Sequence, residues 1–154
     1  MEMMKMKMKM KMKKSFASVA LALLLVPAVQ ASEADVKVVT NASTGGVQIK
    51  REALRVAFLG TSARWADGQP VLAVDQSVRS SVRARFSESL LSQSVIAVQA
   101  HWMSQISSGK GRPPLTKASD AEVIAYVQAT PGAIGYVAGD TSIEPGVKVL
   151  QVIQ

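Results

Sequence analysis

The chain has 154 residues, of which 18 are basic and 11 acidic, and its formal net charge is +7. It contains no cysteine and one histidine, so the sequence offers no disulfide and few of the ligands that transition metals prefer. A basic chain would ordinarily suggest nucleic-acid binding, but six of the lysines lie within the first 14 residues. The charge therefore belongs to the start of the chain and does not predict a nucleic-acid partner.

Residues 1–31 are typical of a secretory signal peptide. A basic segment, MEMMKMKMKMKMKK, precedes the apolar segment SFASVALALLLVPAV, and the small residues around Ala31 predict cleavage after it. Because MKKSFASVALALLLVPAVQA is complete by itself, translation from Met1 or from Met12 stays open. Removing residues 1–31 leaves 123 residues with a net charge of +2. We therefore predict a periplasmic protein without a stable membrane anchor.

Residues 32–154 predict a single α/β domain with a central mixed sheet flanked by helices. The expected elements, in chain order, are a strand at 36–40, a loop at 41–46, a helix at 50–60, a loop at 61–70, a strand at 71–75, helices at 78–90 and 94–106, a loop at 107–119, a helix from 119 to 129, and strands at 133–137 and 147–153.

Apolar stripes predict the buried face of each helix. The stripe of the first helix consists of Leu54, Ala57 and Phe58, and Gly60 suits a left-handed residue just past its end. The stripes of the next two helices are Val78, Val82, Phe86 and Leu90, and then Val95, Val98, Trp102 and Ile106. Ser119 and Glu122 predict a capping box at the start of the last helix.

The segment TPGAIGYV, residues 130–137, predicts a helix end followed by a strand. Pro131 lacks the donor that would continue the helix, and Gly132 accepts a positive φ. Gly135 predicts a place where the strand passes close to neighbouring backbone, with Ile134 and Tyr136 on one side of the strand. A helix stop and a packed strand explain this segment without a ligand, so we interpret it as a marker of the fold before a binding site.

Three segments in this order resemble periplasmic phosphate-binding proteins, which belong to the type 2 periplasmic binding-protein class. They are EALRVAFLG with the following Trp-x-Asp-Gly loop, VLAVDQSVRSSVRARFSESLL, and TPGAIGYV. The resemblance spans roughly residues 36–150, and the motif GKGRPP extends it to short, secreted, single-lobe relatives. It implies one lobe of that fold and binding of phosphate or a related oxyanion. It also implies an ABC transporter permease or another envelope protein as a partner in transport or sensing.

The residues that would bind the anion follow the strand VLAV. In the resembled family, backbone N–H groups and hydroxyls at a helix N-terminus hold the anion, which points to Ser77, Arg79, Ser80 and Ser81. The family's Ser-Gly-Thr turn is replaced here by Ser80, Ser81 and Val82. A serine-rich helix start with solvated arginines explains the same residues without a ligand.

We expect neither an enzyme nor a bound cofactor or metal. His101 is isolated, no Gly-x-Ser-x-Gly motif is present, and no pair of acidic residues suggests acid–base catalysis. A two-lobed binding protein usually needs about twice this length, so a second copy forming a homodimer is one source of the missing lobe. The alternative function is a ligand-free interaction module that docks on an envelope protein or on itself.

Overall fold

The sheet has six strands in the order β2-β6-β1-β5-β3-β4. The computed structural model describes residues 35–154, so the signal peptide predicted at residues 1–31 lies outside the described residues. The strands are β1 (Val36–Asn41), β2 (Gln48–Lys50), β3 (Leu72–Gln76), β4 (Leu115–Lys117), β5 (Ala133–Ala138) and β6 (Val147–Ile153), and the helices are α1 (Arg51–Leu59), α2 (Ser81–Ser89), α3 (Val95–Ser107) and α4 (Asp120–Ala129).

Strand β1 lies in the middle of the sheet, antiparallel to both β5 and β6. The other pairs, β2 with β6, β5 with β3 and β3 with β4, are parallel. Val39 of β1 lies opposite Gly135 of β5 and Val149 of β6. Strand β1, at the start of the described residues, is therefore hydrogen-bonded to β6, near their end. The predicted mixed sheet is confirmed.

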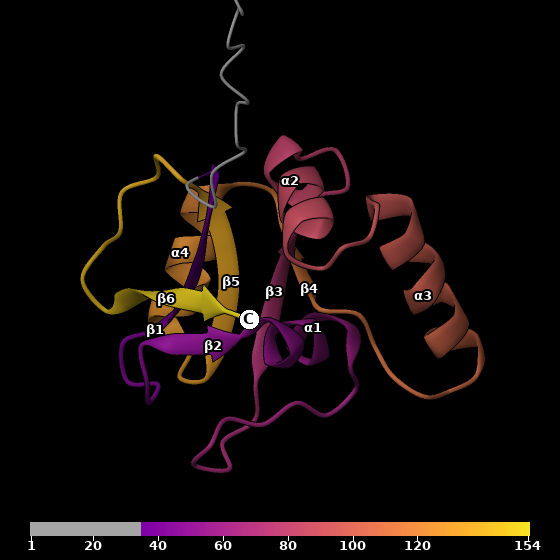
Figure 1. Ribbon diagram of the computed structural model, residues 1–154, viewed down its shortest axis with the longest axis horizontal. Helices are drawn as coiled ribbons and strands as arrows, with labels where there is room; N and C mark the ends of the chain where they lie inside the picture. Colours follow the sequence, from indigo (N-terminus) through magenta and orange to yellow (C-terminus); the bar gives the residue numbers. More distant parts are fainter. Residues whose placement is uncertain (1–34) are drawn as a thin grey trace, which may run out of the picture.

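Helices cover both faces of this sheet (Figure 1). Because side chains alternate along a strand, Val38, Ile134 and Tyr136 face α1, α2 and α3, whereas Val39 and Val137 face α4. Figure 1 shows α3 at the outer edge of the molecule, far from α4. Each face thus has its own apolar core, and the sheet separates the two.

Three aromatic rings fasten α1 and α2 to the sheet. The rings of Phe86 and Tyr136 stack with centroids 3.8 Å apart, and Phe58 meets Phe86 edge-on at 4.7 Å. All three side chains are fully buried. Aromatic pairs of this geometry add about 0.5–1.5 kcal/mol beyond the area that they bury. The cluster therefore fixes α2 directly over the strand formed by the AIGYV segment.

Several local predictions are confirmed. Gly132 has a φ of +80° and ends α4, as the Pro-Gly pair indicated. Ser119 caps α4, and its hydroxyl accepts a hydrogen bond from the N–H of Glu122 at 3.2 Å. The Glu122 carboxylate completes the capping arrangement by accepting from the N–H of Ala118 at 2.9 Å. Short-range backbone chemistry accounts for each of these features.

Other predictions were wrong. Gly60 is extended, with φ at −90°, and is needed because a Cβ there would lie 2.5 Å from the carbonyl oxygen of Val56. Val78 lies in the turn before α2 and is exposed, because the cap at Ser80 starts the helix only at Ser81. Ile106 is 49% exposed. The buried residues of α3 are Val98 and Trp102, and the turn that follows them, which contains Ile106, is not covered by another described element.

The sequence pattern did not predict strands β2 and β4. Both are three residues long and lie at the two edges of the sheet. Each exists through parallel pairing with a strand that is distant in sequence, β2 with β6 and β4 with β3. A three-residue segment carries too little pattern to predict such pairing.

Gly135 tests the packing of α4 on the sheet. A Cβ at this position would lie 2.7 Å from Cγ1 of Val74 and 2.8 Å from Cγ1 of Val123. We expect Gly135→Ala to lower the free energy of unfolding by about 1–3 kcal/mol, measured by urea denaturation, because β5 and α4 must separate. Gly45→Ala is the control, since a Cβ there meets nothing within 4 Å. Equal stability of the two variants would contradict this account of the packing.

Candidate functional site

The candidate site lies where β3 ends and α2 begins. Ser80 is the N-cap of α2, with φ −70° and ψ 126°. Its hydroxyl accepts a hydrogen bond from the N–H of Arg83 at 3.2 Å and donates one to Oε1 of Gln76 at 2.7 Å. The turn between strand and helix closes through the N–H of Ser80, which donates to the carbonyl of Ser77 at 2.9 Å. The cap therefore fixes where the helix starts.

The four predicted anion-binding residues lie together in this turn, but they differ in what they offer. Arg79 and Ser81 are exposed, and Ser77 is half-buried. The Ser80 hydroxyl already donates to Gln76. The first N–H groups of a helix have no partner in the preceding turn. The groups that remain for a ligand are thus the N–H groups of Ser81 and Val82, the Ser77 and Ser81 hydroxyls and the Arg79 guanidinium.

A buried ion pair lies beneath the turn. Nη2 of Arg83 is 3.0 Å from Oδ2 of Asp75, and the two side chains are only 7% and 9% exposed. Nη1 of Arg83 also donates to the carbonyl of Gln76 at 2.7 Å. Tyr136 donates its hydroxyl hydrogen to Oδ1 of Asp75. The charge of Arg83 is therefore balanced inside the protein, which leaves Arg79 as the exposed cation of the turn.

The Gln76 side chain extends this network to α4 and β5. Its Nε2 donates to Oδ1 of Asp120 at 2.7 Å and to the carbonyl of Tyr136 at 3.0 Å. The other oxygen of Asp120 accepts from the N–H of Ala138 at 2.9 Å and from the hydroxyl of Thr141 at 2.6 Å. Both carboxylates are thus held by several donors. The Ser80 hydroxyl points to an amide oxygen and not to a base, so the arrangement supports positioning more readily than nucleophilic catalysis.

Tyr136 has a strongly perturbed hydroxyl. Burial raises the pKa of Tyr136 far above its usual range, and the negative charge of Asp75 raises it further. The hydroxyl consequently stays protonated and remains a donor to Asp75 throughout the physiological range. This bond connects β5 with β3 through residues 61 positions apart.

Sequence reasoning missed Asp75, Gln76, Arg83, Asp120 and Tyr136 as members of this site. One signal was available, because Arg83 precedes Phe86 by three residues and Leu90 by seven, which puts it on the buried face of the helix. An arginine on a buried face requires a partner that is itself removed from water.

His101 has a packing role in the structure. Its Nε2 lies 2.7 Å from the carbonyl oxygen of Leu59, at the end of α1, and its ring meets Trp102 edge-on at 5.2 Å. Within residues 35–154, no group of three His, Cys, Asp or Glu side chains has the arrangement of a metal site. In the same part of the chain, no helix is long and apolar enough to cross a membrane.

Comparison with known proteins gives a match by structure. No protein-family model and no curated protein sequence matches the chain. An ABC-type phosphate transport receptor from Vibrio cholerae superposes with a TM-score of 0.58 at 19% identity, over 77% of this chain and 46% of that one. PstS from Borrelia burgdorferi gives 0.57 at 18% identity, over 77% and 47%.

A third structure extends this similarity to a liganded protein. It is a putative phosphate ABC transporter substrate-binding protein with bound phosphate from Clostridium perfringens, with a TM-score of 0.59 at 14% identity over 77% of this chain and 44% of that one. The chain has a periplasmic-binding-protein-like fold. The resemblance noted in the sequence is confirmed at the level of the fold. The chain spans less than half the length of each of these proteins.

Tyr136→Phe tests the buried network through pH. The unfolded chain loses the Tyr136 proton near pH 10 while the folded protein keeps it. The contribution of Tyr136 to the free energy of unfolding is therefore fully present below about pH 10 and is lost as the pH rises further. We expect Tyr136→Phe to be less stable by about 1–3 kcal/mol near pH 8, because Asp75 loses a donor. Above pH 10 the free energy of unfolding of the variant should fall less steeply than that of the wild type. The two slopes should differ by about 1.4 kcal/mol per pH unit, the effect of one proton. Urea denaturation across this range measures both, and an unchanged slope would contradict the assignment.

Proposed function

We propose that this chain is a binding module for a small oxyanion, with phosphate as the first candidate. The observation that carries the proposal is an open helix N-terminus, at the start of α2, in a fold shared with phosphate transport receptors. Unpaired N–H groups and the helix dipole favour negative charge at such a position. The site also follows the carboxyl end of a strand that is parallel to both of its neighbours, the end at which open α/β sheets bind ligands.

Each of the four residues has a distinct role in the proposal. Ser81 contributes its N–H and its hydroxyl, and Ser77 contributes a second hydroxyl. Arg79 supplies the positive charge, since Arg83 is neutralised by Asp75. Ser80 positions the turn through its cap and its bond to Gln76. Charge-assisted hydrogen bonds to an oxyanion are about twice as strong as neutral ones, so Arg79 should dominate the affinity.

The proposed setting is the periplasm, reached through the signal peptide at residues 1–31. The described residues would form one wall of a binding cleft, and a second copy or an envelope partner is proposed to form the other. An ABC transporter permease is the partner that fits a role in phosphate transport or sensing. This setting rests on the sequence of residues 1–31 and on the similarity to transport receptors.

Phosphate titration by calorimetry tests the site. Arg79→Ala should weaken phosphate binding about tenfold or more, because it removes the charge-assisted bonds. Ser81→Pro removes one N–H while the helix persists, since proline is tolerated at the first helical position and Ser80 already has the extended backbone that precedes proline. It should also abolish tight binding.

Lys110→Ala is the control for the phosphate titration, because it makes the same change in net charge at an exposed position of the loop before β4, outside both candidate sites. Sulfate in place of phosphate measures the selectivity of the site. The absence of binding heat with either anion, on a folded sample, would refute the proposed anion site.

A second candidate function is a ligand-free interaction module, favoured by the outer face of α3. Ile96, Met103 and Ile106 lie on one face of this helix and are 77%, 63% and 49% exposed. The 13 residues of α3 include no charged side chain. Two copies could therefore pack these helices together without like-charge repulsion, and two-fold dimers are the commonest oligomers.

Sedimentation velocity tests this second function. If α3 forms the interface, the wild-type protein should sediment as a dimer, and Met103→Lys should make it a monomer because a lysine charge would be buried in the contact. Val149→Lys, at an exposed position of β6, is the matched control and should stay dimeric. A monomeric wild-type protein at high concentration would exclude self-association through α3.

A further inference from the structure

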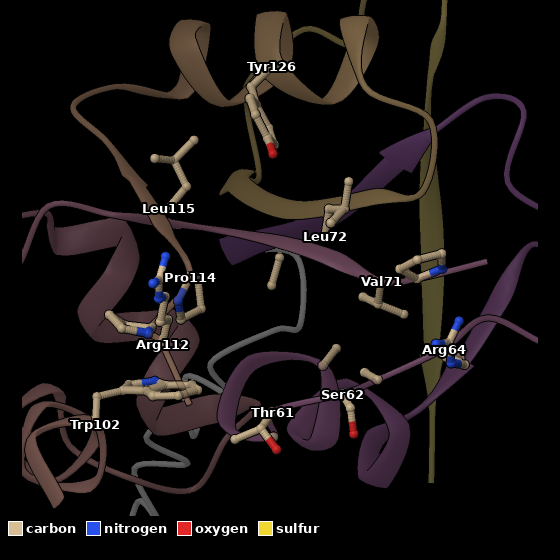
Figure 2. A pocket seen from close by; sticks show the side chains of 16 residues that line it. Thr61, Ser62, Arg64, Val71, Leu72, Trp102, Arg112, Pro114, Leu115 and Tyr126 are labelled. Atoms are coloured by element: carbon tan, nitrogen blue, oxygen red, sulfur yellow. The ribbon is translucent and has the colours of Figure 1, made fainter. Parts of the chain in front are cut away.

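A second cavity lies at the opposite end of β3 from the proposed anion site. It has a volume of about 400 Å³ and is formed by the loop after α1, the start of β3, Trp102 of α3, the loop before β4, and Tyr126 of α4. Its volume falls within the range of about 300–1,000 Å³ that is typical of small-molecule sites. Figure 2 shows the aromatic ring of Trp102 at one end of the cavity and Tyr126 at the other, with the Tyr126 hydroxyl pointing inward.

The charges around this cavity are of one sign. Arg64 and Arg112 line it, and no acidic residue belongs to its lining. The ammonium group of Lys117 lies 5.3 Å from the ring centroid of Tyr126, which is one of the lining residues. The hydroxyl of Tyr126 adds a neutral donor, whereas the hydroxyls of Thr61 and Ser62 point away from Arg112 and Tyr126 in Figure 2. An anion entering the cavity would thus meet cationic and hydroxyl groups, without a carboxylate from the lining to repel it.

Trp102 supplies an independent observation that points to a ligand. Its side chain is only 5% exposed, yet its Nε1 donor has no hydrogen-bond partner within the described residues. An unpaired buried donor costs about 1–3 kcal/mol, and such groups are few in folded proteins. Arg112 and Trp102 both line the cavity, and Figure 2 shows them at the same end of it. An oxygen atom of a ligand bound by Arg112 would be well placed to accept from this indole N–H.

The walls of the cavity are held by specific contacts. A Cβ on Gly111 would overlap the methyl group of Thr61, so the loop before β4 is packed tightly against the loop after α1. Pro113 and Pro114 follow after Arg112 and restrict the backbone of that loop. The bond from His101 to the Leu59 carbonyl joins α3 to the end of α1. These contacts hold the two loops and α3 in place without a ligand, which lowers the entropic cost of ordering them on binding.

We propose that this cavity binds a small aromatic carboxylate. The carboxylate group would lie between the Arg112 guanidinium and the indole N–H of Trp102, where a charged bidentate partner and a buried donor converge. The aromatic ring would occupy the apolar part of the cavity, formed by Val71, Leu72 and Leu115, under Tyr126. This site is separate from the start of α2, so it does not depend on phosphate binding there.

Nuclear magnetic resonance gives a direct readout, because the chain has two tryptophans and hence two indole N–H signals. The indole N–H of Trp65 already donates to the carbonyl of Gly132 at 2.9 Å and serves as an internal reference. Titration of the purified protein with phenylacetate should shift the Trp102 signal in a saturable way and leave the Trp65 signal in place. Trp102→Phe assigns the two signals.

Two variants and one neutral probe locate the binding. Arg112→Ala should weaken phenylacetate binding about tenfold or more through loss of the charge-assisted bonds, whereas Arg79→Ala should bind as the wild type does. Phenylacetamide, which has the same ring without the charge, should bind far more weakly. The proposal is overturned if the Trp102 signal does not shift at roughly 10 mM phenylacetate. Equal binding of phenylacetamide, or undiminished binding by Arg112→Ala, would also overturn it.

Discussion

The buried pair of Asp75 and Arg83 is the interaction on which the rest of this structure depends. It joins the end of β3 to the first turn of α2, and Tyr136 ties both to the centre of the sheet. Removing two charges from water is expensive, so such a pair persists only when further hydrogen bonds satisfy its atoms. Asp75 accepts from Tyr136 and from the N–H of Gln76, and Arg83 donates to the Gln76 carbonyl, which leaves Nε of Arg83 as the atom of the pair without a partner among the described residues. These bonds fix the position and direction of the first turn of α2 relative to the end of β3.

The same pair determines what the surface above it can bind. Because Arg83 is neutralised from within, the exposed turn relies on Arg79 and on backbone donors for its positive potential. The opposite end of β3 has a different character, with two arginines, an unpaired indole donor and aromatic walls. One strand thus separates the site proposed for a compact, fully polar anion from the cavity proposed for an anion with an apolar part.

The short length of the chain affects how its fold relates to function. Phosphate transport receptors share this fold over less than half of their own length. A fold by itself does not specify an activity, because function depends on the groups that a particular site presents. One wall of a cleft leaves a bound anion open to water, which weakens every electrostatic contact. A partner that covers the start of α2 would therefore strengthen binding as well as complete the cleft.

The sequence by itself determined the features that depend on neighbouring residues. The end of α4 at Pro131 and Gly132, the cap at Ser119 and the sidedness of Ile134 and Tyr136 all follow from local backbone preferences. The sequence also indicated a helix start after the strand VLAV. The anion site in the turn from Ser77 to Ser81 stays a prediction that rests on the resemblance to phosphate-binding proteins.

Tertiary structure alone decided which residues meet across long separations. Strand β2 exists because β6 lies beside it, and Arg83 is buried because Asp75 and Tyr136 converge on it. Ile106 continues the apolar stripe of α3 in the sequence, yet no described residue buries it. The physical reason is common to all three: pairing and burial depend on partners contributed by distant segments, and a local pattern does not contain them.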